Sequence, residues 1–156
     1  ADWASWADDD GKISLIVNMM LLQNSLFLSL SSYTPIVSGS SSEGTATYTQ
    51  QDGRYIKIGR LVIGYANAFW VDHTGVGGID ISLPVDSQSG PSVGGGGSVI
   101  SSSALSWPAA KQLTVSVIAG SNTARILGLE SGSSASLIPL DTNAGLTILF
   151  AYFSQT

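Results

Sequence analysis

The 156-residue chain contains no cysteine, only one histidine and few charged residues. Without cysteine it can form no disulfide, no thiol nucleophile and no thiolate zinc site. Charged residues make up 11% of the sequence, whereas a typical soluble domain has about 25%. A surface with so few charges is poorly suited to a free monomer, so we expect an oligomer.

Positive charge is especially scarce. Six Lys and Arg against eleven Asp and Glu give a formal net charge of -5. No basic cluster is present to neutralise phosphates, so we expect no nucleic-acid partner. The acidic start of the chain lacks the positive region of a secretory signal, and we therefore expect no signal peptide.

Residues 13–30 form an uncharged, largely apolar run that is long enough to span a membrane. Asn and Gln side chains in its middle, and the lack of flanking basic residues, disfavour a membrane partner. If the run is helical, its polar residues form one narrow stripe and leave a broad apolar face. We therefore expect residues 1–32 to form a helix or extended arm that is buried against other protein subunits. Its expected contact residues are Ile16, Met20 and Phe27.

From residue 33 onward, short apolar stretches alternate with turns. The spacing predicts about eight strands and a single domain over residues 33–156, most simply an antiparallel β-sandwich with jelly-roll topology. No repeat of 20 to 50 residues is present, which disfavours a propeller or solenoid. The expected strands include 45–50, 54–58, 79–83, 113–118, 124–129 and 146–153.

Two glycines are expected to shape the first long strands. Asp52-Gly53 is a strong hairpin signal because glycine accepts positive φ, so we expect a turn there. The apolar residues change parity after Gly59, which predicts a β-bulge at that glycine. Beyond it, the expected inward set comprises Leu61, Ile63, Tyr65, Phe69 and Val71.

The final strand, residues 146–153, is apolar on both faces. Such a strand lies either centrally between two layers or at a subunit interface. Its expected core or subunit-contact residues are Leu146, Ile148, Phe150 and Tyr152. In contrast, the Gly- and Ser-rich stretch 86–98 predicts a flexible loop.

No catalytic motif stands out in the sequence. The run GGGGS lacks the ending of a phosphate loop, and no Gly-x-Ser-x-Gly elbow is present. In the acidic run DDDG, Lys12 occupies the position where a calcium ligand should follow. A Ser-His-Asp site would have to use His73, and its neighbour Asp72 points to the opposite face of a strand. Glycoside hydrolysis needs two converging carboxylates, which sequence alone does not establish. We expect no enzyme, no metal and no cofactor.

The best small-ligand candidate is the stretch FWVDHTG. Trp70 departs from the inward set of its strand, which predicts an exposed ring, and Asp72 and His73 follow it. Aromatic faces beside polar groups suit sugar rings, and Trp107 could supply a second platform. The alternative is that both tryptophans pack between subunits.

Three parts of the sequence carry a family resemblance: SYTPIVSGS with TYTQQDGRYIKIGRLV, then GGIDISLP, and finally LTILFAYFSQT. They resemble a module found at the C-termini of tailed-phage tail fibres and in related small virion proteins. The resemblance covers about residues 33–156 and implies a trimeric β-sandwich on the exterior of a phage particle, without catalysis or cofactor. Residues 1–32 depart from it, since they contain neither a collagen-like repeat nor a coiled-coil heptad. The matching positions are Tyr33, Thr34, Pro35, Tyr48, Gly53, Tyr55, Lys57, Ile58, Gly59, Val62, Ile81, Leu83, Pro84 and Tyr152.

The resemblance leaves two functions open. As a structural protein, the chain would be a homotrimeric head-decoration or cement protein, attached through residues 1–32 to the major capsid protein or another virion protein. As a binding module, it would be the tip of a tail fibre that recognises a host surface glycan through exposed aromatic residues. We favour the decoration role because the apolar N-terminal arm requires a protein surface. A capsule-degrading enzyme ranks third. Such an enzyme would ordinarily need a larger scaffold and a visible pair of acidic residues.

Overall fold

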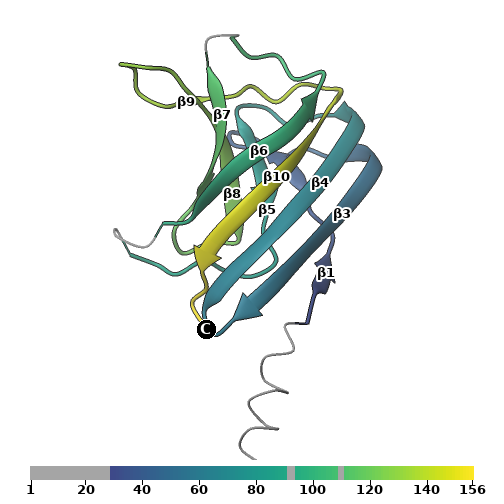
Figure 1. Cartoon of the computed structure of the whole chain (residues 1–156). Helices are drawn as coiled ribbons and strands as arrows, with labels where there is room; N and C mark the ends of the chain where they lie inside the picture. Colours follow the sequence, from purple (N-terminus) through teal and green to yellow (C-terminus); the bar gives the residue numbers. More distant parts are fainter. Residues whose placement is uncertain (1–28, 91–93, 109–110) are drawn as a thin grey trace, which may run out of the picture.

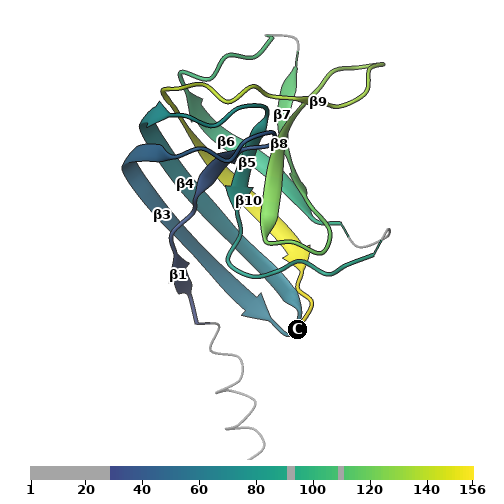
Figure 2. The same cartoon turned by 180° about the vertical axis from the view of Figure 1, so that it is seen from behind.

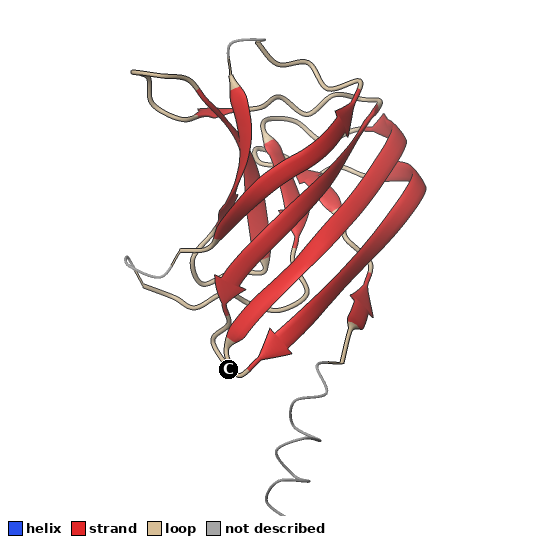
Figure 3. Ribbon diagram, viewed as in Figure 1, coloured by secondary structure: helices blue, strands red, loops and turns tan. Residues whose placement is uncertain are grey.

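The chain folds into one antiparallel sheet that curls over itself (Figures 1 and 3). The computed structural model describes residues 29–90, 94–108 and 111–156. Within these ranges there are ten strands and no helix, hence no helix that could cross a membrane. The expected antiparallel all-β fold class is confirmed. The strands are β1 (Ser31–Tyr33), β2 (Val37–Gly39), β3 (Ala46–Ile58), β4 (Leu61–His73), β5 (Ile79–Ser82), β6 (Gly96–Ser103), β7 (Gln112–Val117), β8 (Thr123–Leu129), β9 (Ser136–Leu137) and β10 (Ala144–Phe153).

The strands follow the spatial order β1-β3-β4-β10-β6-β7-β8-β5-β2, with β9 paired to β8. Figure 1 shows β3, β4, β10 and β6 as the near layer, and the view from behind in Figure 2 brings β5, β7 and β8 forward. The two layers of this sandwich are therefore halves of one hydrogen-bonded sheet. They join where β6 pairs with β7 over three residue pairs, from Gly96↔Ser116 to Ser98↔Thr114.

The core lies between the two layers and is built from alternate residues of each strand, as the period of two requires. On β10 the inward residues are 0–2% exposed, so the strand predicted to be apolar on both faces turns one complete face into the core. The opposite layer supplies aliphatic side chains from β5, β7 and β8. The main core residues are Val62, Ala66, Ala68, Trp70, Ile79, Ile81, Val115, Val117, Ala124, Ile126, Leu146, Ile148, Phe150 and Tyr152.

The β4 residues of the core belong to the parity opposite to the expected one. Val62, Ala66, Ala68 and Trp70 are 0–1% exposed, whereas Ile63 and Val71 are 46% and 49% exposed. The prediction that the odd-numbered set of Leu61, Ile63, Tyr65, Phe69 and Val71 faces inward is therefore wrong. The small side chains of Ala66 and Ala68 leave room in the core for Trp70 and for the large side chains of β10. The face of β4 that carries the larger apolar residues therefore lies on the outside of the sheet.

The turn between β3 and β4 lies at Gly59 and Arg60, because Ile58 pairs with Leu61. Gly59 has a φ of +59°, which fits the first central position of a type II′ hairpin turn. The change of parity after Gly59 thus marks a chain reversal, and the predicted bulge there is wrong. The predicted turn at Asp52-Gly53 is also wrong, since both residues lie inside β3. Gly53 is needed because the Tyr33 ring occupies the space of a β-carbon.

Part of the expected loop 86–98 is a strand. Gly96, Gly97 and Ser98 begin β6 and pair with both β10 and β7. At Gly97 the backbone of Leu149 approaches so closely that a β-carbon would overlap it. The glycines therefore permit close strand contact here, and the loop prediction is wrong for these residues.

The N-terminal arm expected over residues 1–32 lies almost wholly outside the described residues, as do Ile16, Met20 and Phe27. Strand β1 starts at Ser31 and pairs with β3 through Ser31↔Tyr55. The sheet therefore begins two residues before the expected boundary at residue 33.

Two tyrosines with buried hydroxyls differ in how their hydrogen-bonding groups are satisfied. Tyr152 donates to the Val85 carbonyl oxygen at 2.8 Å and accepts from the Val85 N–H at 3.3 Å. The Tyr33 hydroxyl is buried without a hydrogen-bond partner among the described residues, and its ring meets Phe150 edge to face. Burial raises the pKa of Tyr152 to about 12 and raises the pKa of Tyr33 well above its usual value of 10.

We expect Gly59→Val to lower the free energy of unfolding by about 1–3 kcal/mol, because a β-branched residue at positive φ is strained. Gly94→Val is the matched control: a β-carbon would also meet open space there, and no positive φ is required. Urea unfolding of both variants measures the difference. Equal stability of the two would show that the turn does not require glycine.

We expect Tyr33→Phe to leave stability at pH 7 unchanged or slightly higher, since it removes a buried hydroxyl that has no partner in the described part of the chain. Tyr152→Phe should cost about 0.5–1.5 kcal/mol, because it leaves the Val85 groups unpaired.

A pH series tests the same pair of tyrosines. A folded-state pKa raised above 10 means that stability is fully present below pH 10 and falls as the pH rises toward 12. Wild-type stability should therefore drop over this window in urea unfolding, and each Phe variant should drop less. An identical alkaline slope in all three proteins would contradict the assignment.

Candidate functional site

The predicted sugar-binding patch at the end of β4 does not exist as one exposed surface. Trp70 is only 1% exposed, and its Nε1–H donates to the backbone carbonyl of Asp141 at 2.8 Å. The expectation of an exposed ring is therefore wrong, because Trp70 shares the inward parity of Ala66 and Ala68. An aromatic side chain buried in this way stabilises the fold and offers no face to a ligand.

His73 is also buried, at 3% exposure, and it holds backbone in place. Its Nδ1 accepts a hydrogen bond from the Gly75 N–H at 2.9 Å, so the ring hydrogen sits on Nε2. Nε2 donates to the carbonyl oxygen of Val37 at 3.0 Å. Both ring nitrogens are thus engaged within the fold, which leaves neither available as a catalytic base or ligand contact.

Val37 is the point where the two ends of the curled sheet meet. Besides His73 of β4, Tyr48 of β3 binds it: the hydroxyl accepts from the Val37 N–H at 2.7 Å and is 3.2 Å from the carbonyl oxygen, to which it donates. Gln51, also on β3, donates from Nε2 to the Pro35 carbonyl at 2.8 Å. We call the hydrogen bonds from Tyr48, Gln51 and His73 to the segment 35–37 the seam.

Trp107 lies in a groove separate from Asp72, which is exposed on β4. The groove forms where β6 and β7 stop pairing beyond Ser98, and its volume is about 300 Å³. Val99, Trp107 and Leu113 of its lining pack against the core, and its polar lining consists of serine hydroxyls, Gln112 and Lys111. The volume is at the lower end of the range for ligand pockets. This arrangement can hold a small neutral polar molecule against one aromatic ring.

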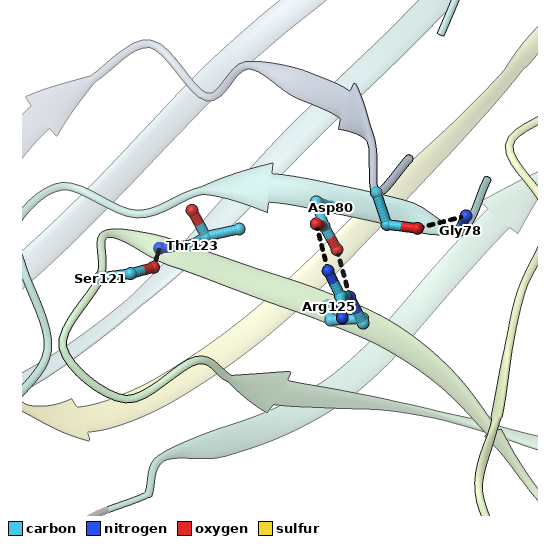
Figure 4. Close-up of polar contacts among 6 residues, drawn as sticks. Gly78, Asp80, Ser121, Thr123 and Arg125 are labelled. Carbon is cyan, nitrogen blue, oxygen red and sulfur yellow. Dashed lines mark hydrogen bonds and ion pairs between the residues drawn. The ribbon is translucent and has the colours of Figure 1, made fainter. Parts of the chain in front are cut away.

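Ionic groups elsewhere are engaged structurally. Asp80 and Arg125 face each other across β5 and β8 and form a two-pronged ion pair with both N–O distances at 2.7 Å (Figure 4). The hydrogen bond to Asp80 raises the pKa of Arg125, although burial opposes the rise. Asp141 accepts from the Ser106 N–H at 2.6 Å through its side chain. Among the described residues no three His, Cys, Asp or Glu side chains gather in a way that could hold a metal ion.

The expected contact residues of β10 point into the core of the single chain. Leu146, Ile148, Phe150 and Tyr152 are at most 2% exposed, so they offer no surface to another subunit. The alternate residues of the strand point outward, and among them Leu149 and Phe153 are both 48% exposed. Any contact with another protein through β10 must therefore use this outer set.

The outer residues of β10 belong to a contiguous apolar surface at one end of the sheet. The pairs Ile58↔Leu61 and Ile56↔Ile63 join β3 to β4, and Leu61↔Phe153 extends the row to β10. Directly paired residues on one face lie within contact distance of each other. We call this surface the apolar outer patch; its members are Ile56, Ile58, Leu61, Ile63, Leu149 and Phe153.

Sequence reasoning missed the patch although it identified the alternating apolar residues that form part of it. It grouped Leu61 with Ile63 correctly but assigned the group to the core. The exposures of Ile58 and Ile63, 50% and 46%, show the opposite. Exposed apolar groups that adjoin one another in this way mark interaction surfaces more often than isolated ones do.

The fold is similar to part of a phage tailspike, and this likeness is found at the level of structure. No family model matches the sequence, and no curated protein matches it either. A crystal structure of the Dettilon tailspike protein superposes with a TM-score of 0.65 at 12% identity over 80% of this chain. The chain spans only 23% of that tailspike. At this identity the likeness establishes a shared fold with a tailspike segment.

We expect His73→Ala to lower the free energy of unfolding by about 1–3 kcal/mol, because the Gly75 N–H loses its partner and the Val37 carbonyl loses the imidazole donor, although it retains the Tyr48 hydroxyl. The neighbouring substitution Asp72→Ala, at an exposed position, should change stability by no more than about 0.5 kcal/mol. Chemical denaturation of the two variants makes the comparison. A larger loss for Asp72→Ala than for His73→Ala would show that the seam does not depend on the imidazole.

Proposed function

We propose that the chain is a non-enzymatic structural protein on the exterior of a tailed-phage particle, where it forms a homotrimer. The observation that carries the proposal is the fold shared with a segment of a phage tailspike at a TM-score of 0.65. The order of strand and turn residues along 33–156 supports the same family. The low charge of the chain and its apolar outer patch support assembly with other copies.

An assembly role is better supported than host recognition through aromatic residues. The recognition hypothesis relied on exposed rings at Trp70 and Trp107, and Trp70 is buried. The groove at Trp107 retains one aromatic ring, which is a small platform for a glycan chain. Of the two polar residues that were to complete the patch, His73 is buried and serves the seam, and Asp72 is exposed on β4 and separate from the groove.

Two positions on the particle are compatible with this role. A head-decoration protein would use the apolar run 13–30, with Ile16, Met20 and Phe27 against the major capsid protein. A tail component is favoured by the tailspike likeness, which covers most of the chain. We propose the head-decoration position first, because an uncharged run of this length requires a large apolar partner.

The test adds purified protein to phage heads that lack it. The variant with Ile16→Asp, Met20→Asp and Phe27→Asp should bind heads at least about a hundredfold more weakly, since each buried side chain contributes about 1.5–3 kcal/mol. The control variant with Ser14→Asp, Asn18→Asp and Ser25→Asp adds the same charge at the positions that a helical run would place on its polar stripe, and it should bind normally. Heads without the protein should burst more readily under heat or osmotic shock.

Three outcomes would change the proposal. Equal binding of both variants to heads would remove the attachment role of the run. Binding to tails but not to heads would replace the decoration role with the tail role. Host-cell binding that is lost in Trp107→Ala would favour glycan recognition through the groove.

A further inference from the structure

The apolar outer patch lies on the outer face of three adjacent strands of the near layer. Its members come from β3, β4 and β10, and the sheet order places β4 between the other two. Four of the side chains, Ile58, Ile63, Leu149 and Phe153, keep 46–50% of their surface exposed. A partner that covers the patch must therefore present a face to it, since strand pairing at an edge would leave it exposed.

The charged groups around the patch are engaged within the chain. Asp52 accepts a 2.5 Å hydrogen bond from the Tyr65 hydroxyl and lies 3.9 Å from Arg54. The two nearest cations are turned toward the C-terminal backbone: Lys57 donates to the Thr156 oxygen and Arg60 donates to the Ser154 carbonyl at 3.1 Å. The patch residues themselves are uncharged, so copies of the chain can bring this surface together around one axis without like charges inside the contact.

The chain enters the sheet at the same end as the patch. Ser31 pairs with Tyr55, and because β1 runs antiparallel to β3, the preceding Leu30 comes at the level of Ile56. Leu30 is 56% exposed. The uncharged run that begins at residue 13 thus ends beside the patch, with 28 residues preceding the described structure. Copies that share the patch would bring their N-terminal runs to one place.

We propose that the apolar outer patch is the contact between copies of this chain, and that it gathers their N-terminal runs into one attachment surface. The inference rests on the homotrimer of the proposed function and names the surface that forms it. The occupant of the patch is another copy of the chain: the patch residues are uncharged and apolar, they stay exposed in the single chain, and the chain enters the domain beside them.

The test compares two double variants of the full chain by sedimentation. Ile63→Lys with Leu149→Lys places charge on two central strands of the patch, whereas Val76→Lys with Leu129→Lys adds the same charge at exposed apolar positions outside it. Since the chain has a net charge of -5, the added lysines lower overall repulsion in both variants. The patch variant should associate at least about a hundredfold more weakly than wild type, and the control should associate normally.

Hydroxyl-radical footprinting of the wild-type protein gives a measurement that does not depend on a variant folding. The reactivity of Leu149 and Phe153 should fall as concentration drives association, while that of Val76 stays constant.

A patch variant that still forms the wild-type oligomer would overturn the inference and leave the homotrimer standing. A wild-type monomer with a protected patch would assign the patch to the chain's own run and overturn the inference. A monomer with a reactive patch would overturn the inference together with the homotrimer, while the head-binding assay would still test attachment independently.

Discussion

The seam around Val37 is the constraint on which the rest of the structure depends. The sheet curls over its own core, and the seam holds β2, at one end of the sheet, to β3 and β4 near the other end. The hydroxyl of Tyr48 and the imidazole of His73 reach the same Val37 carbonyl from these two strands, at 3.2 and 3.0 Å. Without these two side chains, the buried backbone groups of this segment would lose hydrogen-bond partners, at a cost of about 1–3 kcal/mol for each group left unpaired.

Strand β10 contributes one face to the core and the other face to the exposed surface of the molecule. Its inward residues fill the core, and its outward residues Leu149 and Phe153 extend the surface begun by Ile58 and Ile63. The strand predicted to be apolar on both faces therefore serves two purposes. One face stabilises the chain, and the other is available to other proteins. This division explains how a domain with 11% charged residues can have a complete core and an apolar exterior.

Local patterns predicted the existence of most strands, because the alternation of apolar and polar residues reflects the extended backbone directly. They failed where a distant residue decided the outcome. Gly53 indicates a turn by itself, but it is glycine because Tyr33 lies over it, 20 positions earlier in the chain. Trp70 was predicted to be exposed because the larger apolar residues of its strand lie at odd-numbered positions. Its own face contains the small residues Ala66 and Ala68 and therefore looked less apolar than the other face. The groove at Trp107 depends on where β6 and β7 separate, which no sequence pattern records.

Strand β3 is the longest of those near a sheet edge, and β1 covers only three of its thirteen residues. Its pairing with β4 shifts register twice, on either side of Tyr48, within the stretch that β1 leaves uncovered. Such shifts break the straight row of N–H and C=O groups that another strand would need for pairing. Edge-to-edge growth into fibrils is disfavoured as a result, and the sheet remains finite.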